Sequence, residues 1–271
     1  MAINDVSLAG GMRNNLVNLQ SVAALQARTT QRLSTGKRVN SAIDDPSAFF
    51  AAQNATNRAS DLAARKDGMG QAIQTVKAAL QGIDGITNLI QQAKGLTASA
   101  RSASLTDRAA LSVQFDALRG QIDQLALDAG YKGTNFLAAA SSLKVDFNES
   151  GTSSLTITGF DAGTTGLAVA AAANTWQLDA NIDTASTALD TALSTLRTKA
   201  QTLASNNGVV TARQDFTTNM INTLTTGADM LTAADTNEEG ANMLALQTRQ
   251  QLGIVALQLS SQAQSSVMRL F

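Results

Sequence analysis

The sequence predicts a mainly α-helical protein: a long antiparallel coiled-coil bundle with paired N- and C-terminal helices and a small central β-hairpin patch. Residues of the AVILMFWYC group make up 44% of the chain but aromatics only 4%, so alanine and aliphatic side chains dominate. Such a composition suits closely spaced helices. Apolar residues also recur at alternating steps of four and three along most of the chain. Pro46 is the one proline, so almost nothing interrupts a helix after it.

Two missing residue types exclude whole classes of chemistry. The chain has no Cys and no His, which excludes disulfides, thiolate nucleophiles, the usual zinc sites and Ser-His-Asp triads. We therefore predict no catalytic residue, no metal site and no cofactor. A net charge of −1 offers no basic footprint for nucleic acid. No membrane span is expected, and residues 1–30 lack the apolar core of a signal peptide, so we expect any export to need no cleaved signal.

The N-terminal segment predicts a helix with a coiled-coil seam at Met12, Leu16, Leu19 and Ala23, although an ordinary amphipathic helix remains an alternative. It should end between residues 32 and 36. The next helix should begin close to Pro46, because a residue that precedes proline is disfavoured in helical geometry.

Two further helices should form an antiparallel hairpin. Apolar spacing runs from Met69 to Leu96 and again from Leu111 to Leu125, and we expect a turn over residues 97–105 between them. Ser104 and Asp107 form a capping-box pattern at the start of the second helix. Gly130 is a plausible end.

Residues 131–176 change character. Leu143, Val145 and Phe147 alternate with charged residues, residues 148–151 have turn chemistry, and Leu155 and Ile157 alternate with threonine. These features predict the β-hairpin. Helical spacing then returns from Ile182 to Leu231, and residues 235–237 break it before the last helix.

The last helix is apolar on most of its sides, so most of its sides should be buried. Pairing with residues 1–33 would cover one face only. We therefore expect the two ends to be ordered by neighbouring molecules, unless the middle of the same chain covers both faces.

Three stretches resemble bacterial flagellins: RLSTGKRVNSAIDDP at residues 32–46, YKGTNFL at residues 131–137, and ALQTRQQL at residues 245–252 with the closing Leu270–Phe271. Together with the order of the elements, the resemblance covers essentially the whole chain. It implies a subunit that self-assembles into the flagellar filament for swimming motility and works outside the cell.

The resemblance also implies a domain plan. Residues 1–45 and 235–271 would form the terminal coiled coil of the inner tube. Residues 46–130 and 177–234 would form the helical outer-tube domain, with residues 131–176 as its small β element. Implied partners are further copies of the chain, the filament cap, the hook–filament junction proteins, and the export chaperone and type III export apparatus.

Assembly-interface residues follow from the same comparison. We predict coiled-coil contacts and polar contacts that set register between subunits at Leu16, Leu19, Arg32, Leu33, Arg38, Asp44, Asp45, Arg249, Leu252, Val255, Leu259 and Leu270.

Two weaker implications concern the outer surface. Many flagellins carry an Arg/Glu-rich patch for an innate immune receptor; the matching segment here contains Gln92, Lys94, Gly95 and Leu96, so we predict weak or no recognition. Many are also O-glycosylated on outward hydroxyls. The candidates, for which a plain polar surface is the alternative, are Ser150, Thr152, Ser153, Thr164, Thr165, Thr175, Thr184 and Ser186.

Three rival functions fit the sequence less well. A hook–filament junction protein shares the terminal helices, but the C-terminal match and the compact centre favour flagellin. A signalling coiled coil would need membrane spans or a longer unbroken heptad hairpin. An enzyme is the poorest match, because the adjacent carboxylates at 44–45 and 238–239 are explained by helix capping and dipole effects.

Overall fold

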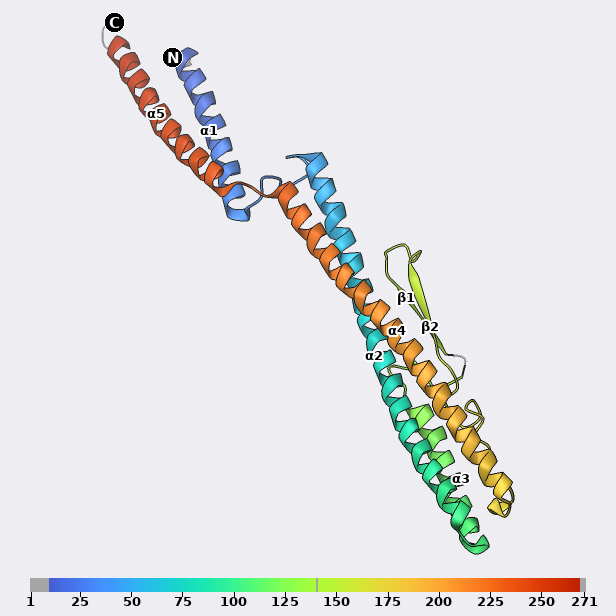
Figure 1. Cartoon of the computed structure of the whole chain (residues 1–271). Helices are drawn as coiled ribbons and strands as arrows, with labels where there is room; N and C mark the ends of the chain where they lie inside the picture. Colours follow the sequence, from blue (N-terminus) through green and yellow to red (C-terminus); the bar gives the residue numbers. More distant parts are fainter. Residues whose placement is uncertain (1–9, 140, 269–271) are drawn as a thin grey trace, which may run out of the picture. The chain divides into compact units, whose positions relative to one another are not determined.

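The computed structural model describes residues 10–139 and 141–268. Its elements, in chain order, are α1 (Gly10–Thr35), α2 (Pro46–Ser102), α3 (Leu105–Asp128), β1 (Ser142–Asp146), β2 (Ser154–Thr158), a short 3-10 helix η1 (Ala173–Trp176), α4 (Asp179–Thr232) and α5 (Thr236–Met268) (Figure 1). The predicted fold class, mainly helical with one small antiparallel sheet, is confirmed.

The chain divides into two compact units. We call residues 1–57 with 223–271 the terminal unit, and residues 58–222 the central unit. Both boundaries fall inside long helices, α2 and α4. Residues 46–57 and 223–234, which the sequence analysis grouped with the outer-tube domain, therefore cluster with the chain ends.

In the terminal unit, α1 and α5 pack against each other in antiparallel directions (Figure 1). The seam differs from the predicted one. Met12 and Leu19 are half-buried as expected, but Asn15 and Val22 share the seam with them, whereas Leu16 and Ala23 are exposed. In a coiled coil, every third or fourth residue faces the partner helix. After Met12 the next residue that faces α5 is Asn15, three positions on, rather than Leu16, four positions on. The seam on α1 consequently includes polar residues, namely Asn15 and, further along, Gln26 and Thr29.

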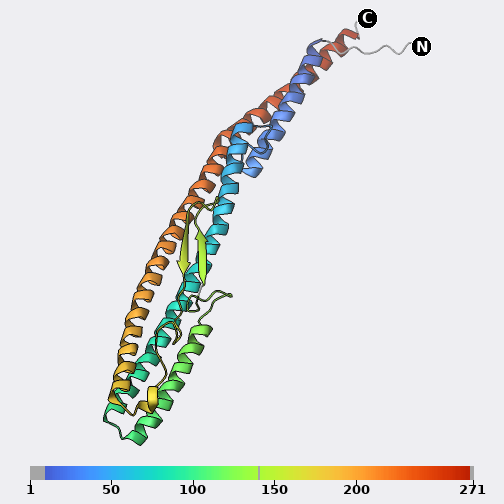
Figure 2. The same ribbon diagram turned by 90° about the vertical axis from the view of Figure 1, so that its right-hand side faces the viewer.

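The central unit has a continuous apolar core contributed by α2, α3, the hairpin and α4. Figure 2 shows α3 alongside α2. Phe115 of α3 packs against Trp176 with 5.0 Å between ring centroids, and both side chains are fully buried. Burial of such rings dominates core energetics. This unit therefore has a core of its own, although Val113, Leu127 and Phe216 remain more than half exposed.

The helical hairpin differs from expectation at one end. α2 continues to Ser102, so the turn shrinks to the two residues before α3 rather than beginning at Thr97. Thr97 is buried and donates its hydroxyl to the Lys94 carbonyl, which lets it stay within the helix. Ser104 is the predicted N-cap: the Asp107 amide donates to Ser104 Oγ at 3.3 Å, and the Ser104 hydroxyl donates to Asp107 Oδ2 at 2.7 Å, so Asp107 reaches back to the serine side chain.

The β-hairpin has the predicted strands and turn. Leu143 lies opposite Ile157 and Val145 opposite Leu155, so all four apolar side chains share one face. Val145 and Ile157 are buried in the core of the central unit. The strands thus serve as a cover for the helices rather than as an independent sheet, since an isolated hairpin is marginal in water.

Candidate assembly surface

The joint between α1 and α2 is held to the joint between α4 and α5 by backbone hydrogen bonds. The Thr232 carbonyl accepts from the amides of Arg38 at 2.7 Å and Val39 at 3.3 Å, and the Ala234 amide donates to the Gly36 carbonyl at 2.9 Å. Gly36 has φ +67, a left-handed conformation that glycine adopts without strain as it ends a helix. The two segments between helices, which lie 190 or more positions apart in sequence, are therefore joined by backbone hydrogen bonds.

An ion pair fastens the start of α5 to the end of α1. Arg32 Nη1 lies 2.8 Å from Glu239 Oε1, and the Glu239 side chain is only 9% exposed. Asp235 caps α5, because its carboxylate accepts from the amides of Asn237 at 2.9 Å and Glu238 at 3.2 Å. The sequence indicated only a helix-dipole effect for Glu239, and its partner Arg32 was not predicted. The available signal was its spacing of four and seven residues from Met243 and Leu246, which places all three on one helix face.

Asp44 shapes the loop before α2. Its Oδ2 accepts from the Asn40 amide at 3.1 Å, the Ser41 amide at 3.0 Å and the Ser41 hydroxyl at 3.1 Å. The amide of Asn40, followed by the two Ser41 groups, holds the pKa of the Asp44 carboxyl below its usual value. Asp45 caps α2 by accepting from the Ala48 amide at 3.0 Å. Both carboxylates thus accept hydrogen bonds within their own chain.

The predicted register residues therefore differ in what they offer to another molecule. Arg32, Asp44 and Asp45 already have partners within the chain. Arg38 and Arg249 are exposed. Contacts between subunits at these five positions remain a prediction.

α5 carries two apolar faces on opposite sides. The buried or half-buried residues of its inner face are Glu239, Met243, Leu246, Gln250, Gly253, Leu257 and Ser260, of which Met243, Leu246 and Leu257 are the large apolar ones. At about 100° per residue, Leu244, Leu252, Val255 and Leu259 fall within about 80° of one another on the opposite side of the helix. These four are 67%, 64%, 53% and 67% exposed. We call them the outer stripe.

The inner face of α5 approaches α1 closely. A Cβ added at Gly253 would lie 3.1 Å from Leu19 Cγ, so glycine lets the two helices come together. This accounts for the half-burial of Leu19, while Leu33 is also half-buried near the end of α1. α1 therefore covers one face of α5 and leaves the outer stripe to solvent. Leu270 lies outside the described residues.

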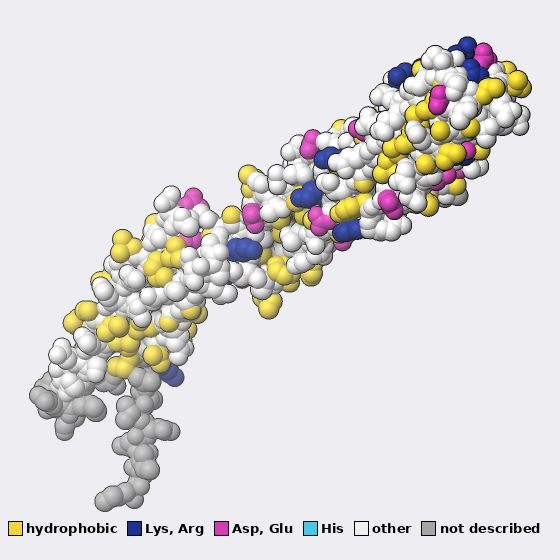
Figure 3. Space-filling view, turned by 90° about the horizontal axis from the view of Figure 1, so that it is seen from below, with side chains coloured by type: hydrophobic (Ala, Val, Ile, Leu, Met, Phe, Trp, Pro, Cys, Tyr) yellow, Lys and Arg dark blue, Asp and Glu magenta, His cyan; other side chains and the backbone are white. Residues whose placement is uncertain are grey.

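Charge is almost absent from this region. Arg249 is the one charged residue from Gly240 to Met268. On the face shown in Figure 3, apolar side chains gather beside the grey terminal residues, and blue or magenta ones are few there. Charge repulsion and hydration of charged groups normally oppose association, and this surface has exposed leucines and a single charge. It is therefore suited to contact with another apolar surface.

The outer-surface residues named from the sequence lie in the central unit. Gln92 and Gly95 are exposed, Leu96 is half-buried, and Lys94 pairs with Asp190 at 2.5 Å. One glycosylation candidate is corrected. Thr164 is only 4% exposed, and its amide and hydroxyl both donate to Asp123, at 2.7 and 3.0 Å. It faces inward because this contact ties its loop to α3.

The other glycosylation candidates are more accessible. Ser150 and Thr152 are exposed and share contacts with Asn148 at the hairpin turn. The modification of five more candidates remains a prediction: Thr165 in a loop and Thr175 in η1 are exposed, Thr184 on α4 is exposed, Ser186 on α4 is half-buried, and Ser153 is half-buried beside the turn.

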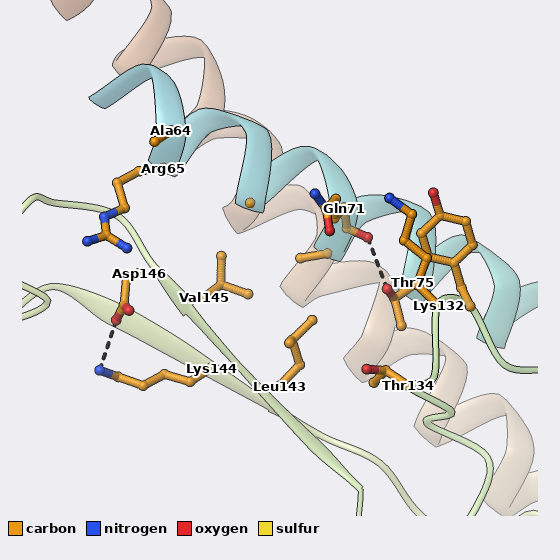
Figure 4. Close-up of a pocket in the computed structure, with 13 residues that line it drawn as sticks. Ala64, Arg65, Gln71, Thr75, Lys132, Thr134, Leu143, Lys144, Val145 and Asp146 are labelled. Carbon is orange, nitrogen blue, oxygen red and sulfur yellow. Dashed lines mark hydrogen bonds and ion pairs between the residues drawn. The ribbon is translucent and has the colours of Figure 1, made fainter. Parts of the chain in front are cut away.

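A cavity of about 250 Å³ lies in the central unit between α2, β1 and the turn at residues 131–134 (Figure 4). Lys144 Nζ pairs with Asp146 at 2.8 Å within it, and the Thr75 hydroxyl is committed to the Gln71 carbonyl. Among the described residues no group of three His, Cys, Asp or Glu side chains has the arrangement of a metal site. None of the described helices is long and apolar enough to cross a bilayer.

The family model and the sequence relatives agree on one family. Residues 3–142 match the model of the bacterial flagellin N-terminal helical region. Flagellin FljM of Caulobacter vibrioides is 32% identical over 275 residues and covers 100% of both chains. A flagellin of Brucella melitensis is 27% identical and covers 96% of this chain and 99% of its own. A Bacillus cereus flagellin structure matches 55% of this chain and 88% of that one, with 18% identity and a TM-score of 0.49.

Proposed function

The chain belongs to the bacterial flagellin family and is a subunit of the extracellular flagellar filament, and we propose that the outer stripe of α5 is a principal surface through which its copies assemble. The observation that carries this proposal is the pair of opposite apolar faces on one helix, of which α1 covers only one. These four side chains are 53–67% exposed, so each would gain about 1–2 kcal/mol from burying the rest of its surface. A neighbouring subunit supplies that burial.

The predicted domain plan fits this arrangement. The α1–α5 pair, with almost no charge on α5, suits the inner tube, where copies pack side by side. The central unit, which has its own core, suits the outer tube. Of the predicted register residues, Arg38 and Arg249 are then the exposed cations available to set register between copies. We assign the chain no catalytic step, since its family is structural.

Other partners follow from the family. We propose that the subunit meets the filament cap and the hook–filament junction proteins at the ends of the filament. Before that, an export chaperone would shield α5, and the type III export apparatus would pass the chain without a cleaved signal. The outer stripe supports the proposal of a chaperone, because an exposed apolar stripe would associate non-specifically before assembly unless a partner covered it. Modification of exposed hydroxyls and weak receptor recognition belong to the same proposal.

A charge in the outer stripe tests the assembly surface. Leu252→Asp should leave the monomer folded, because the leucine is already 64% exposed. It should prevent filament growth, because an aspartate would have to be buried without a partner. Electron microscopy after acid dissociation and return to neutral pH, with seeds added, gives the readout.

Gln247→Asp is the matched control. It adds the same charge to the same helix, at an exposed position outside the outer stripe. Normal filaments from Leu252→Asp, with the control also normal, would show that assembly uses another surface.

A further inference from the structure

Backbone strain in the central unit is concentrated in the segment that leads from β2 to α4. Among the described residues, five other than glycine have a left-handed backbone, and four of them lie here: Ala168, Asn174, Thr175 and Trp176. The last three are consecutive, with φ of +49°, +47° and +57°. Asparagine tolerates this conformation, whereas a β-branched residue such as Thr175 is strained in it. We call residues 168–178 the strap.

Contacts from α3 hold the strap and the start of α4 in place. η1, which is part of the strap, is the short yellow helix beside α3 in Figure 2. The contacts follow one another in opposite chain directions, so the strap runs antiparallel to α3. They join Arg119 Nε to the Val169 carbonyl at 2.8 Å, Asp116 Oδ1 to the Ala172 amide at 3.1 Å, the Phe115 ring to the Trp176 ring, and Arg108 Nη1 to Asp179 Oδ1 at 2.8 Å. A strained backbone persists only where surrounding contacts fix it in this way.

Two buried donors at the same contacts have no acceptor. Trp176 Nε1 and Arg108 Nε lack a hydrogen-bond partner among the described residues, and the tryptophan side chain is fully buried. A buried N–H without a partner has lost the hydrogen bonds that water gives it in an exposed state. Lifting the strap would restore those bonds and relax the backbone, but it would expose the Trp176 and Phe115 rings. Aromatic burial therefore keeps the strap closed against two opposing costs.

We propose that the strap is a conformational device that lifts away from α3 and closes again while α2 and the body of α4 stay folded. Trp176 acts as its catch, because its burial against Phe115 is what the closed form gains. Segments of a stable fold open locally when the free energy of opening is smaller than that of global unfolding. The open form is a minor population, so the strap stays protected most of the time. The proposal does not depend on the filament role.

The indole proton of Trp176 measures the opening directly. Trp176 is the one tryptophan of the chain, so its indole N–H gives a single nuclear magnetic resonance signal. Because the side chain is fully buried, that proton exchanges with solvent only when the strap opens. After correction for intrinsic exchange rates, its opening constant should be about tenfold to hundredfold larger than those of the Ile86 and Ile90 amides in α2.

Substitution at Thr175 tests whether backbone strain drives the opening. The Thr175 side chain is exposed, and its hydroxyl bonds only to the neighbouring Asn174 carbonyl. Glycine adopts the left-handed conformation without strain, so Thr175→Gly should make the opening about threefold to tenfold rarer. Ala173→Gly is the matched control, since Ala173 is exposed in the same segment and its backbone is not left-handed. It should leave the opening unchanged or make it up to about threefold more frequent, because glycine adds freedom to the open form.

Two results would overturn the proposal. If the indole proton opened no more often than the Ile86 and Ile90 amides, the strap would open only with the whole unit. If Thr175→Gly and Ala173→Gly changed the opening constant in the same direction and to the same extent, the left-handed backbone would not be its cause.

Discussion

The central unit and the α1–α5 pair of the terminal unit are built from similar helices but bury them differently. The central unit places Trp176, Phe115 and Phe136 in its core, each with 0% exposure. It also joins its helices by ion pairs, such as Arg101 with Asp183 and Lys94 with Asp190. The α1–α5 seam includes Asn15, Gln26 and Gly253, and leucines remain outside. The comparison teaches that one chain can bury its large aromatic side chains in one unit and leave a stripe of leucines exposed in the other; we propose that only an assembly covers that stripe.

The largest expected difference is in the cost of losing a large apolar side chain. Trp176→Ala should lower the free energy of unfolding of the monomer by about 3–5 kcal/mol, because a buried ring leaves a cavity. Leu252→Ala, in the outer stripe, should change it by less than about 0.5 kcal/mol. Urea unfolding followed by far-ultraviolet circular dichroism gives both numbers.

Trp176→Phe is the control for the first variant. It keeps a ring against Phe115 and removes an indole nitrogen that has no hydrogen-bond partner among the described residues. It should cost less than the alanine variant. Equal costs at Trp176 and Leu252 would mean that the two regions are not built differently.

A smaller effect is expected at the ion pair that ties α5 to α1. Glu239→Gln should weaken the start of α5 by about 1–3 kcal/mol, because Arg32 loses a charged, mostly buried partner. Faster amide exchange in residues 236–246 should report it, with the central unit unchanged. Glu238→Gln, exposed and next in sequence, is the control. Equal amide exchange rates over residues 236–246 in the two variants would show that the Arg32–Glu239 ion pair does not stabilise the start of α5.

The smallest effect concerns acid. The pKa of Asp44 is held below its usual value of 3.8, so its contribution to the loop is fully present above about pH 4 and is lost as the pH falls through the lower folded pKa. Nuclear magnetic resonance should show the Asn40 and Ser41 amides shifting with that titration. Asp44→Asn should abolish the pH dependence. If the chemical shifts of these amides changed with a midpoint at the usual aspartate pKa, the hydrogen bonds to Asp44 described above would be contradicted.

Much of this comparison was readable in the sequence. The recurrence of apolar residues every three or four positions predicted the helices. Ser104 and Asp107 predicted the N-cap of α3, and the alternation of apolar and polar residues over 143–157 predicted the hairpin. The helix limits near Gly36 and Pro46 were predicted because glycine and proline act through local geometry, which needs no knowledge of distant residues.

What was missed depends on contacts between distant residues. The seam of α1 was misassigned at Leu16 and Ala23, because which of two adjoining apolar stripes is buried depends on how α5 lies against it. Thr164 was taken as an outward hydroxyl, whereas Asp123 holds it from 41 residues away. The Arg32–Glu239 pair spans 207 residues. Residue type alone indicates none of these pairings.

Hydrogen exchange measured on monomer and filament tests the central claim most directly. Peptides from residues 241–268 should exchange quickly in the monomer and slowly in the filament, while peptides from Trp176, Phe115 and their neighbours stay protected in both. If α5 amides in dilute monomer were as protected as those of the central unit, the outer stripe would need no neighbour, and the account would be wrong.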